Sequence, residues 1–386
     1  MYPNLYYALK DLTGIDIPGL RFINSFGFFV ALAFLGAAWT LSLELKRKSQ
    51  QGLLIYEETK ITVGKPASIS ELLTNFFLGF LLGYKIIGAF VVGPDDPQAF
   101  IFSSQGSMPA GLLTGLLFAG LKWWEKNKTK LDKPEERTIR IWPHDRVGDF
   151  VVFAALFGFT GAKVFHNLEN WTEFKADPIG ALLSFSGLTF YGGLICAAIA
   201  ICWYAKKHKI SIRHLCDAAA PGLMLAYAVG RVGCQVSGDG DWGIPNTRPN
   251  PYSWLPDWAW SYTYPHNVIN AGDPIPGCEG QYCSQLPVPH YPTPLYETLV
   301  CLVLFALLWY FRKRIQIPGR LFALYLVVNG IERFFIEKIR VNTRYDIFGF
   351  HPTQAELISS MMVIGGILIW VWMGKLKTST SAASIQ

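Results

Sequence analysis

Arginines within otherwise apolar stretches are the residues of this chain with the clearest capacity for chemistry. Arg231 stands in the stretch GRVGC near the end of an apolar run, and the stretch SGDGDWG that follows supplies Asp239 and Asp241. A charge inside a bilayer costs several kcal/mol unless it is paired or reaches water, so each such residue indicates a functional site. The alternative is an arginine whose side chain extends to the membrane surface. The neighbouring glycines favour a ligand instead, because they let a backbone approach one closely.

A second group of charges, Glu332, Arg333, Glu337 and Arg340, occupies the stretch IERFFIEKIR. Spacings of four and seven residues predict that Arg333, Glu337 and Arg340 share one stripe of a helix. Two arginines beside one glutamate leave about one net positive charge, which suits an external anion. The alternative is a self-satisfied ion network that only holds two helices together.

Further polar residues stand at the ends of apolar runs. Glu297 follows Tyr296 at the start of one run, where an acid favoured by the helix dipole is an equally good explanation. Lys163 and His166 lie at the end of another run. His166 alone is better explained as a residue at headgroup level than as a catalyst.

A phenol beside two glycines forms the last group. Tyr191 precedes Gly192 and Gly193 inside an apolar run, and this combination predicts a kinked or closely approached backbone. Cys278 and Cys283 flank four residues of a long polar segment, where a local disulfide and two free thiols are equally good predictions.

Cations with a few acids at the ends of apolar runs suit a phosphate-bearing lipid headgroup better than a metal. The sequence has no His, Cys or Asp spacing typical of a metal site and no phosphate-cradling loop. We therefore predict no metal and no cofactor.

The elements that position these residues are predicted to be membrane helices. The chain of 386 residues is 51% hydrophobic and only 16% charged, which excludes an ordinary soluble surface. A helix needs about 20 apolar residues to cross a bilayer. The sequence predicts an all-α, polytopic transmembrane protein with nine spans near 22–45, 72–92, 107–124, 150–166, 181–204, 215–236, 294–312, 319–337 and 353–374. We predict one membrane domain over 1–374 and a cytoplasmic tail over 375–386.

The distribution of lysine and arginine predicts the orientation. Segments 46–71, 121–149, 205–214, 312–320 and 375–386 hold 23 of the 34 basic residues, against 7 in the alternate segments. Basic loops stay on the cytoplasmic side, so the N-terminus is predicted outside and the C-terminus inside. The outer loop 237–293, rich in Trp, Tyr and Pro, is predicted to cover the site as a lid or to lie among headgroups. The positive net charge reflects this topology, and we predict a monomer that binds no nucleic acid.

Four motifs together resemble the prolipoprotein diacylglyceryl transferase family over roughly residues 150–374. DAAAP at 217–221 leads to GRVGC at 230–234 and Gly243, and PTPLYE follows at 292–297. RFFIEKIR at 333–340 is similar to the Arg-x-x-x-Glu-x-x-Arg helix of the family, and PTQ at 352–354 resembles the start of its last helix. The family has seven helices, and spans 72–92 and 107–124 have no evident counterpart in it.

This resemblance implies transfer of a diacylglyceryl group from phosphatidylglycerol to the lipobox cysteine of a lipoprotein precursor. It implies a multi-pass protein of the bacterial inner membrane with its active site toward the periplasm. Its partners would be phosphatidylglycerol, the prolipoprotein signal peptide and membrane lipids.

The resemblance also implies roles for single residues. Arg231 and Arg333 would hold the phosphate, with Glu337 positioning Arg333 and Tyr191 standing where the family usually has a histidine. Catalytic roles are thereby implied for Arg231, Arg333, Tyr191 and Glu337, and substrate-binding roles for Arg231, Arg340, Glu297, Lys163, Gly192, Gly193, Asp241 and Gly243.

Two alternatives remain open. Tyr191 and Phe26 replace a usual histidine and a usual tyrosine, so the chain could be a paralogue that acts on another acceptor or only binds anionic lipid. A transporter is the second alternative. The sequence shows no internal repeat to support it.

Overall fold

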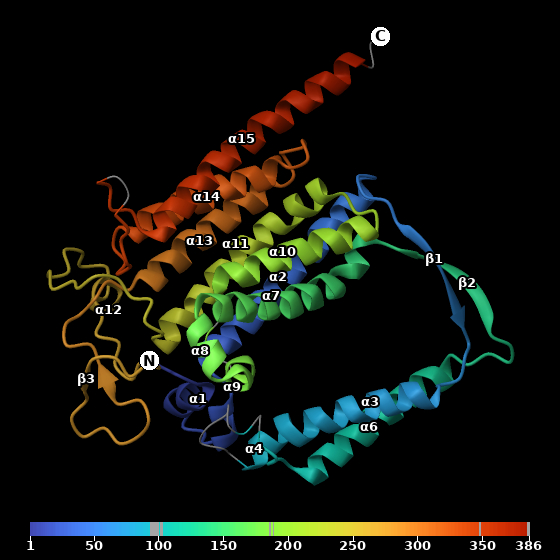
Figure 1. Cartoon of the computed structure of the whole chain (residues 1–386), viewed down its shortest axis with the longest axis horizontal. Coiled ribbons are helices and arrows are strands. Elements are labelled where there is room, and N and C mark those ends of the chain that lie inside the picture. Colours follow the sequence, from blue (N-terminus) through green and yellow to red (C-terminus); the bar gives the residue numbers. More distant parts are fainter. Residues whose placement is uncertain (93–99, 101–102, 185–186, 188, 347–348, 384–386) are drawn as a thin grey trace.

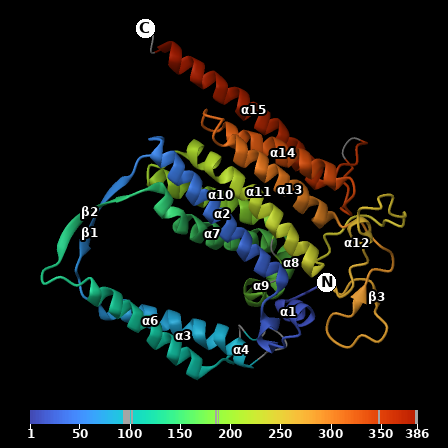
Figure 2. The same cartoon turned by 180° about the vertical axis from the view of Figure 1, so that it is seen from behind.

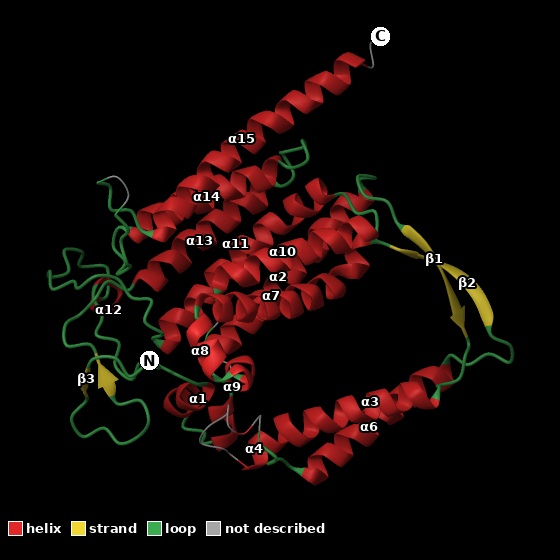
Figure 3. Ribbon diagram, in the orientation of Figure 1, coloured by secondary structure: helices red, strands yellow, loops and turns green. Residues whose placement is uncertain are grey.

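The computed structural model describes the chain except for residues 93–99, 101–102, 185–186, 188, 347–348 and 384–386. The structure is mainly helical, as predicted (Figure 3). Its long helices are α2 (Ser25–Gln50), α6 (Met108–Lys128), α7 (Val147–Glu169), α10 (Phe190–Lys207), α11 (Ile212–Ser237), α13 (Thr293–Phe311), α14 (Arg320–Glu337) and α15 (Gln354–Ala383). Helix α3 (Ile69–Leu82) continues through the π-helical turn η2 (Gly83–Ile87) into α4 (Gly88–Val92). Shorter elements are α1 (Leu5–Thr13), η1 (Pro18–Phe22), η3 (Pro143–Arg146), α8 (Trp171–Ala176) and α9 (Pro178–Leu183).

Five helical stretches among the described residues are long and apolar enough to cross a membrane. They are Ser25–Gln50, Ile69–Val92, Pro143–Glu169, Thr293–Phe311 and Gln354–Lys375. Each overlaps one of the nine predicted spans.

Helix α11 lies at the centre of a bundle and packs against α2 and α13 (Figures 1 and 2). Helix α10 packs on α7, and α15 packs on α14. Close approach of α11 and α2 depends on Gly222, where an added Cβ would lie 2.6 Å from Oγ1 of Thr40. We call the end of the bundle where α11 ends and α13 begins the site end.

Asp217 of α11 fixes the start of α14. Its carboxylate accepts hydrogen bonds from the backbone N–H groups of Gly319 (2.8 Å) and Phe322 (3.0 Å). The first N–H groups of a helix have no partner within the helix, so an acid at this place satisfies them. This contact anchors to α11 the helix that carries Arg333.

A helical hairpin of α3 and α6 lies apart from the bundle in both views (Figures 1 and 2). Gly83 and Gly115 allow its two helices to pack closely, because an added Cβ would lie 2.5 Å from the carbonyl oxygen of Ala110 and 3.0 Å from that of Phe76, respectively. The antiparallel strands β1 (Glu57–Val63) and β2 (Glu135–Ile141) connect the hairpin to the bundle.

Strands β1 and β2 correct the all-α prediction, which placed their residues in the basic loops 46–71 and 121–149. Residues Thr59, Ile61 and Val63 alternate with exposed residues and share one half-buried face of β1. Such β-branched residues favour a strand once a partner strand is present. The partner comes from 72 residues later in the chain, which local sequence patterns do not reveal.

The predicted spans differ from the observed helices by one or more residues at their ends, as three of them illustrate. The region predicted as one span over 181–204 contains the end of α9 and the separate helix α10, which begins at Phe190. The predicted span 150–166 is shorter than the observed helix α7, which runs from Val147 to Glu169. Helix α15 continues beyond the predicted end at 374 to Ala383, because extending an existing helix costs little; residues 384–386 of the predicted tail lie outside the described residues.

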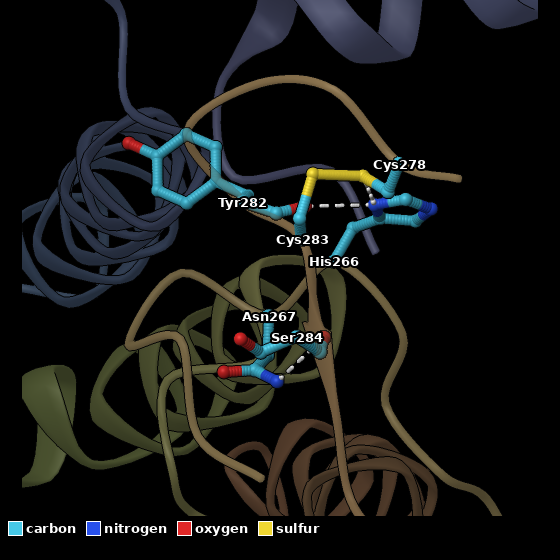
Figure 4. The surroundings of a disulfide bond; sticks show 6 residues. All are labelled: His266, Asn267, Cys278, Tyr282, Cys283 and Ser284. Carbon is cyan, nitrogen blue, oxygen red and sulfur yellow. Dashed lines mark hydrogen bonds between the residues drawn. A yellow bond between two sulfur atoms is a disulfide. The ribbon is translucent and has the colours of Figure 1, made fainter. Parts of the chain in front are cut away.

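The segment after α11 contains little regular structure. It includes α12 (Asp257–Trp260) and the short strands β3 (Asp273–Pro274) and β4 (Ser284–Gln285), which pair antiparallel. Cys278 and Cys283 form a disulfide, which decides the question left open by the sequence (Figure 4). His266 Nδ1 lies 2.8 Å from the carbonyl oxygen of Tyr282 beside this disulfide. The Tyr296 hydroxyl on α13 donates to the carbonyl of Ala259 (2.9 Å) and so ties the segment to the bundle.

Candidate active site

Two arginines and two acids form a closed ring of ion pairs at the site end, and we call these four residues the ion ring. Arg231 Nε lies 2.7 Å from Glu297 Oε2, and Arg340 Nη1 lies 2.9 Å from Glu297 Oε1. Both arginines also contact the carboxylate of Asp241. The Glu297 side chain has no exposed surface. Charges removed from water in this way are stable only when paired, and here each charge has two partners.

Each member of the ion ring comes from a different part of the chain. Arg231 lies near the end of α11, Asp241 in the segment after it, Glu297 near the start of α13, and Arg340 beyond the end of α14. The position of Arg340 corrects the predicted stripe, because α14 ends at Glu337 and the chain then turns. Arg340 therefore reaches Glu297 and does not share a helical stripe with Glu337.

Gly243 holds the chain after Asp241 against the chain around Arg340. Gly243 and Arg340 form an isolated antiparallel bridge, and Ile244 N–H donates to the carbonyl of Ile339 (2.8 Å). An added Cβ at Gly243 would lie 2.5 Å from the Ile339 oxygen, so a larger residue would force the two segments apart. The group that approaches Gly243 closely is therefore the backbone of Ile339.

Arg333 and Glu337 form a separate pair one turn apart on α14. Arg333 Nη2 lies 2.9 Å from Glu337 Oε2, and Asn342 Nδ2 donates to Glu337 Oε1 (2.6 Å). The other terminal nitrogen of Arg333, Nη1, is buried and has no hydrogen-bond partner within the described part of the chain. Glu337 thus pairs with the charge of Arg333 but leaves one of its donor nitrogens without a partner in that part of the chain.

Tyr227 is a site residue that the sequence analysis missed. Its hydroxyl donates to Glu297 Oε2 (2.6 Å), and its ring lies under the Arg231 guanidinium at 5.3 Å. Tyr227 precedes Arg231 by four residues, so helical spacing alone would have placed both on one face of α11.

Tyr191 on α10 lies close enough to Arg333 and Glu337 to interact with their charges. The charges of the Arg333 pair therefore reach this predicted residue. Gly192 and Gly193 are buried against α7, where an added Cβ would lie 2.7 Å from the Gly161 oxygen and 2.8 Å from the Gly158 oxygen, respectively. The backbone at Gly192 and Gly193 is closely approached, as predicted, and the approaching element is helix α7.

Lys163 lies in a different place, in a cavity of about 350 Å³ between α7, α8 and α9. Its Nζ donates to the carbonyl of Ser184 (2.7 Å), and His166 and Asn167 also line the cavity. The residues that line this cavity belong to α7, α8, α9 and the chain that joins or follows them, and they include no member of the ion ring.

The charges around Asp241 determine its ionisation. Burial alone would raise the pKa of Asp241, but the guanidinium groups of Arg231 and Arg340 outweigh burial and lower it. Asp239 lies outside the ion ring, and burial followed by the charge of Asp241 raises its pKa. Cys234, Asp239 and Asp241 have possible ligand atoms within 4.8 Å of one another. Since two arginines already contact Asp241, this group suits guanidinium better than a metal ion.

Replacing Asp239 by asparagine should stabilise the protein near neutral pH. Because the folded-state pKa of Asp239 is raised, the folded protein is disfavoured once pH rises above the unfolded value of about 3.9 and Asp239 must ionise. The Asp239→Asn variant should melt at a higher temperature than the unmodified protein at pH 7, and the difference should shrink at pH 4. A variant that melts at a lower temperature at both pH values would contradict this assignment.

The comparisons with known proteins point to one family. Residues 110–372 match the family described as prolipoprotein diacylglyceryl transferase. The match begins inside α6. The predicted span 107–124 therefore lies largely within the matched residues, although we expected it to have no counterpart in the family.

Several relatives carry the name phosphatidylglycerol--prolipoprotein diacylglyceryl transferase. One from Vibrio vulnificus is 30% identical over 265 residues, which are 67% of this chain and 84% of the relative. One from Dehalococcoides mccartyi is 27% identical over 279 residues, 72% of this chain and 93% of the relative. One from Shouchella clausii is 29% identical over 239 residues, 61% of this chain and 78% of the relative.

Proposed function

Because this chain belongs to the prolipoprotein diacylglyceryl transferase family and is a transferase of that class, we propose that it uses phosphatidylglycerol as its lipid donor. The acceptor is the thiol of the lipobox cysteine in a lipoprotein precursor. The thiolate sulfur attacks the glyceryl carbon that bears the phosphate, a C–S bond forms and the C–O bond breaks. The bonding electrons leave with glycerol phosphate, and the thiol proton goes to water.

The observation that carries this proposal is the buried Nη1 of Arg333, which has no partner within the described chain. A phosphodiester offers such a nitrogen the charge-assisted hydrogen bond that it lacks. The phosphate gains a second negative charge as the C–O bond breaks, so a fixed guanidinium stabilises the transition state more than the bound lipid. Glu337 and Asn342 hold Arg333 in place for this role.

The ion ring supplies the second half of the proposed phosphate site. Asp241 and Glu297 neutralise Arg231 and Arg340, so an arriving phosphate competes with these two acids for the arginines. The ring keeps two buried arginines oriented until that exchange occurs. Lys163 and its cavity lie apart, and we propose that Lys163 contacts the lipid headgroup or the precursor outside the reacting centre.

We also propose nine membrane spans with the N-terminus and the site end toward the periplasm of the bacterial inner membrane. Basic residues concentrate in segments 46–71, 121–149, 205–214, 312–320 and 375–386, which the positive-inside rule places on the cytoplasmic side. Of the helices outside the five apolar stretches, α10, α11 and α14 would span as part of the bundle, where their charges face protein, and α6 would span packed on α3.

Complementation tests the function directly. The chain should restore diacylglyceryl thioethers on lipoproteins when it is expressed in a bacterium depleted of its own transferase. Mass spectrometry of the lipoprotein N-terminus measures the modification. Binding of phosphatidylglycerol without any thioether would instead support a paralogue that only binds anionic lipid, which Tyr191 in place of the usual histidine makes the second candidate.

Tyr191→Phe should lower the transfer rate about tenfold, an increase of about 1.4 kcal/mol in the activation free energy. We propose that the phenol donates a hydrogen bond near Arg333, since an unperturbed phenol with a pKa of about 10 is a poor base at neutral pH. Initial rates with purified enzyme, phosphatidylglycerol and a lipobox peptide measure the effect. Full activity of the variant would remove Tyr191 from the chemistry.

A further inference from the structure

Glu332 is a buried carboxyl group that the proposed phosphate site does not use. Only 8% of the residue is exposed, and neither side-chain oxygen has a hydrogen-bond partner among the described residues. Other buried acids of the bundle are well paired: Glu297 binds two arginines, and Asp217 accepts two backbone N–H groups. Since an unpaired buried charge costs several kcal/mol, Glu332 is stable in this place as a neutral acid that holds a proton.

Charged and titratable groups of three helices face Glu332. They are Tyr227 and Arg231 from α11, Glu297 and Cys301 from α13, and Arg333 from α14 itself. Glu356 of α15, the other helix packed on α14, pairs with Lys338 instead. The proton on Glu332 thus lies inside the group of residues that surrounds the ion ring.

Tyr227 connects Glu332 with the ion ring. The phenol interacts electrostatically with both Glu297 and Glu332. Its hydroxyl proton is directed at Glu297 Oε2 at 2.6 Å, and the Tyr227 side chain lies close enough to the Glu332 carboxyl for its oxygen to accept a proton from a neutral Glu332. The hydrogen bond that Tyr227 donates to Glu297 therefore already has the direction that a proton moving from Glu332 to Glu297 would follow.

We propose that Glu332, Tyr227 and Glu297 form a proton relay that releases the arginines of the ion ring to the phosphate during transfer. This inference rests on the proposed function. The proton of the Glu332 carboxyl moves to the Tyr227 oxygen, while the Tyr227 proton moves to Glu297. Glu332 becomes an anion that faces the Arg333 and Arg231 guanidinium groups, Tyr227 stays neutral, and Glu297 becomes a neutral acid.

Charge balance explains why this shift would accompany the reaction. The phosphate goes from one negative charge to two as the C–O bond breaks and the thioether forms. Protonated Glu297 no longer neutralises Arg231 and Arg340, so both guanidinium groups become available to the second charge. The proton returns to Glu332 when glycerol phosphate leaves, and the thiol proton has gone to water throughout.

Single and double variants test the relay. Glu332→Gln keeps the shape of the side chain but cannot pass a proton, and Tyr227→Phe removes the hydroxyl. Each should lower kcat about 10²-fold with little change in KM for phosphatidylglycerol. The double variant should also lose about 10²-fold, and not the 10⁴-fold product, because residues of one relay act as a unit. The solvent deuterium effect on kcat of the unmodified enzyme should shrink in both variants.

Matched controls separate proton transfer from packing. Tyr325→Phe removes a hydroxyl on α14 that accepts a hydrogen bond from Asn329 (3.1 Å), and this variant should keep the unmodified rate. Glu332→Asp retains an acid and should keep at least a tenth of the activity. Three results would each overturn the relay. The first is a double variant whose loss of kcat equals the product of the two single losses, and the second is an unaltered rate in Glu332→Gln. The third is a Glu332→Asp variant as inactive as Glu332→Gln.

A readout that does not need turnover distinguishes the relay from the proposed function. The infrared band of a protonated carboxyl group should be present in the lipid-free enzyme and absent from Glu332→Gln. A chain that shows this band but forms no thioether would refute the proposed function alone. A chain that forms thioethers but lacks the band would refute the relay alone.

Discussion

Arg333→Ala should reduce diacylglyceryl transfer by about 10³-fold while leaving the bundle folded. The buried Nη1 of Arg333 has no partner within the described residues and is available to the phosphate, whereas Nη2 is held by Glu337 at 2.9 Å. Loss of one well-placed donor to a developing oxyanion typically costs 10²–10³-fold in kcat, and a full guanidinium charge stands at the upper end. Initial rates with a lipobox peptide and phosphatidylglycerol vesicles measure the loss.

Two further variants make the Arg333 result interpretable. Arg333→Lys keeps the positive charge but loses the planar fork that binds phosphate and Glu337 together, so it should recover only a small part of the activity. Arg314→Ala removes an exposed arginine that lies over the Tyr310 ring and should keep the unmodified rate. If Arg333→Ala retained more than a tenth of the activity, Arg333 would not be the principal phosphate ligand.

Local patterns of the sequence predict the helices and most of the site residues, because both depend on residues close in the chain. The run around Arg231, for example, predicts a helix with a polar end, and α11 contains that run. Tyr227 precedes Arg231 by one helical turn, but the sequence did not predict it as a site residue, because a tyrosine in an apolar run usually packs against apolar side chains. Its importance follows from Glu297, which comes 70 residues later.

Long-range pairing explains what the sequence could not predict. The stripe of Arg333, Glu337 and Arg340 assumed that α14 continues, but the chain turns after Glu337 and pairs at Arg340 with Gly243. Strands β1 and β2 likewise require each other. In each case the deciding partner is distant in sequence, and a tertiary contact overrides the local pattern.

Breaking the ion ring at one residue should destabilise the protein far more than breaking an exposed pair. Glu297→Gln leaves Arg231 and Arg340 in a buried place with only Asp241 to neutralise both, which should cost about 3–5 kcal/mol of unfolding free energy. Arg340→Gln should cost a similar amount, because it leaves Glu297 and Asp241 short of one positive charge. Reversible unfolding in mixed micelles measures both values.

The Glu297→Gln/Arg340→Gln double variant should be more stable than the sum of the single effects predicts, with a coupling energy of about 1–3 kcal/mol. The pair of Glu58 and Arg140 on the β1–β2 ribbon is the matched control. Its atoms lie 3.3 Å apart, but its side chains are 52% and 62% exposed, so its coupling should stay below about 1 kcal/mol. Equal coupling in the two pairs would mean that burial adds nothing to the ion ring. A larger coupling in the ion ring would show that the pairing that orients the two arginines also resists their release to the phosphate. A proton on Glu297 would remove that resistance.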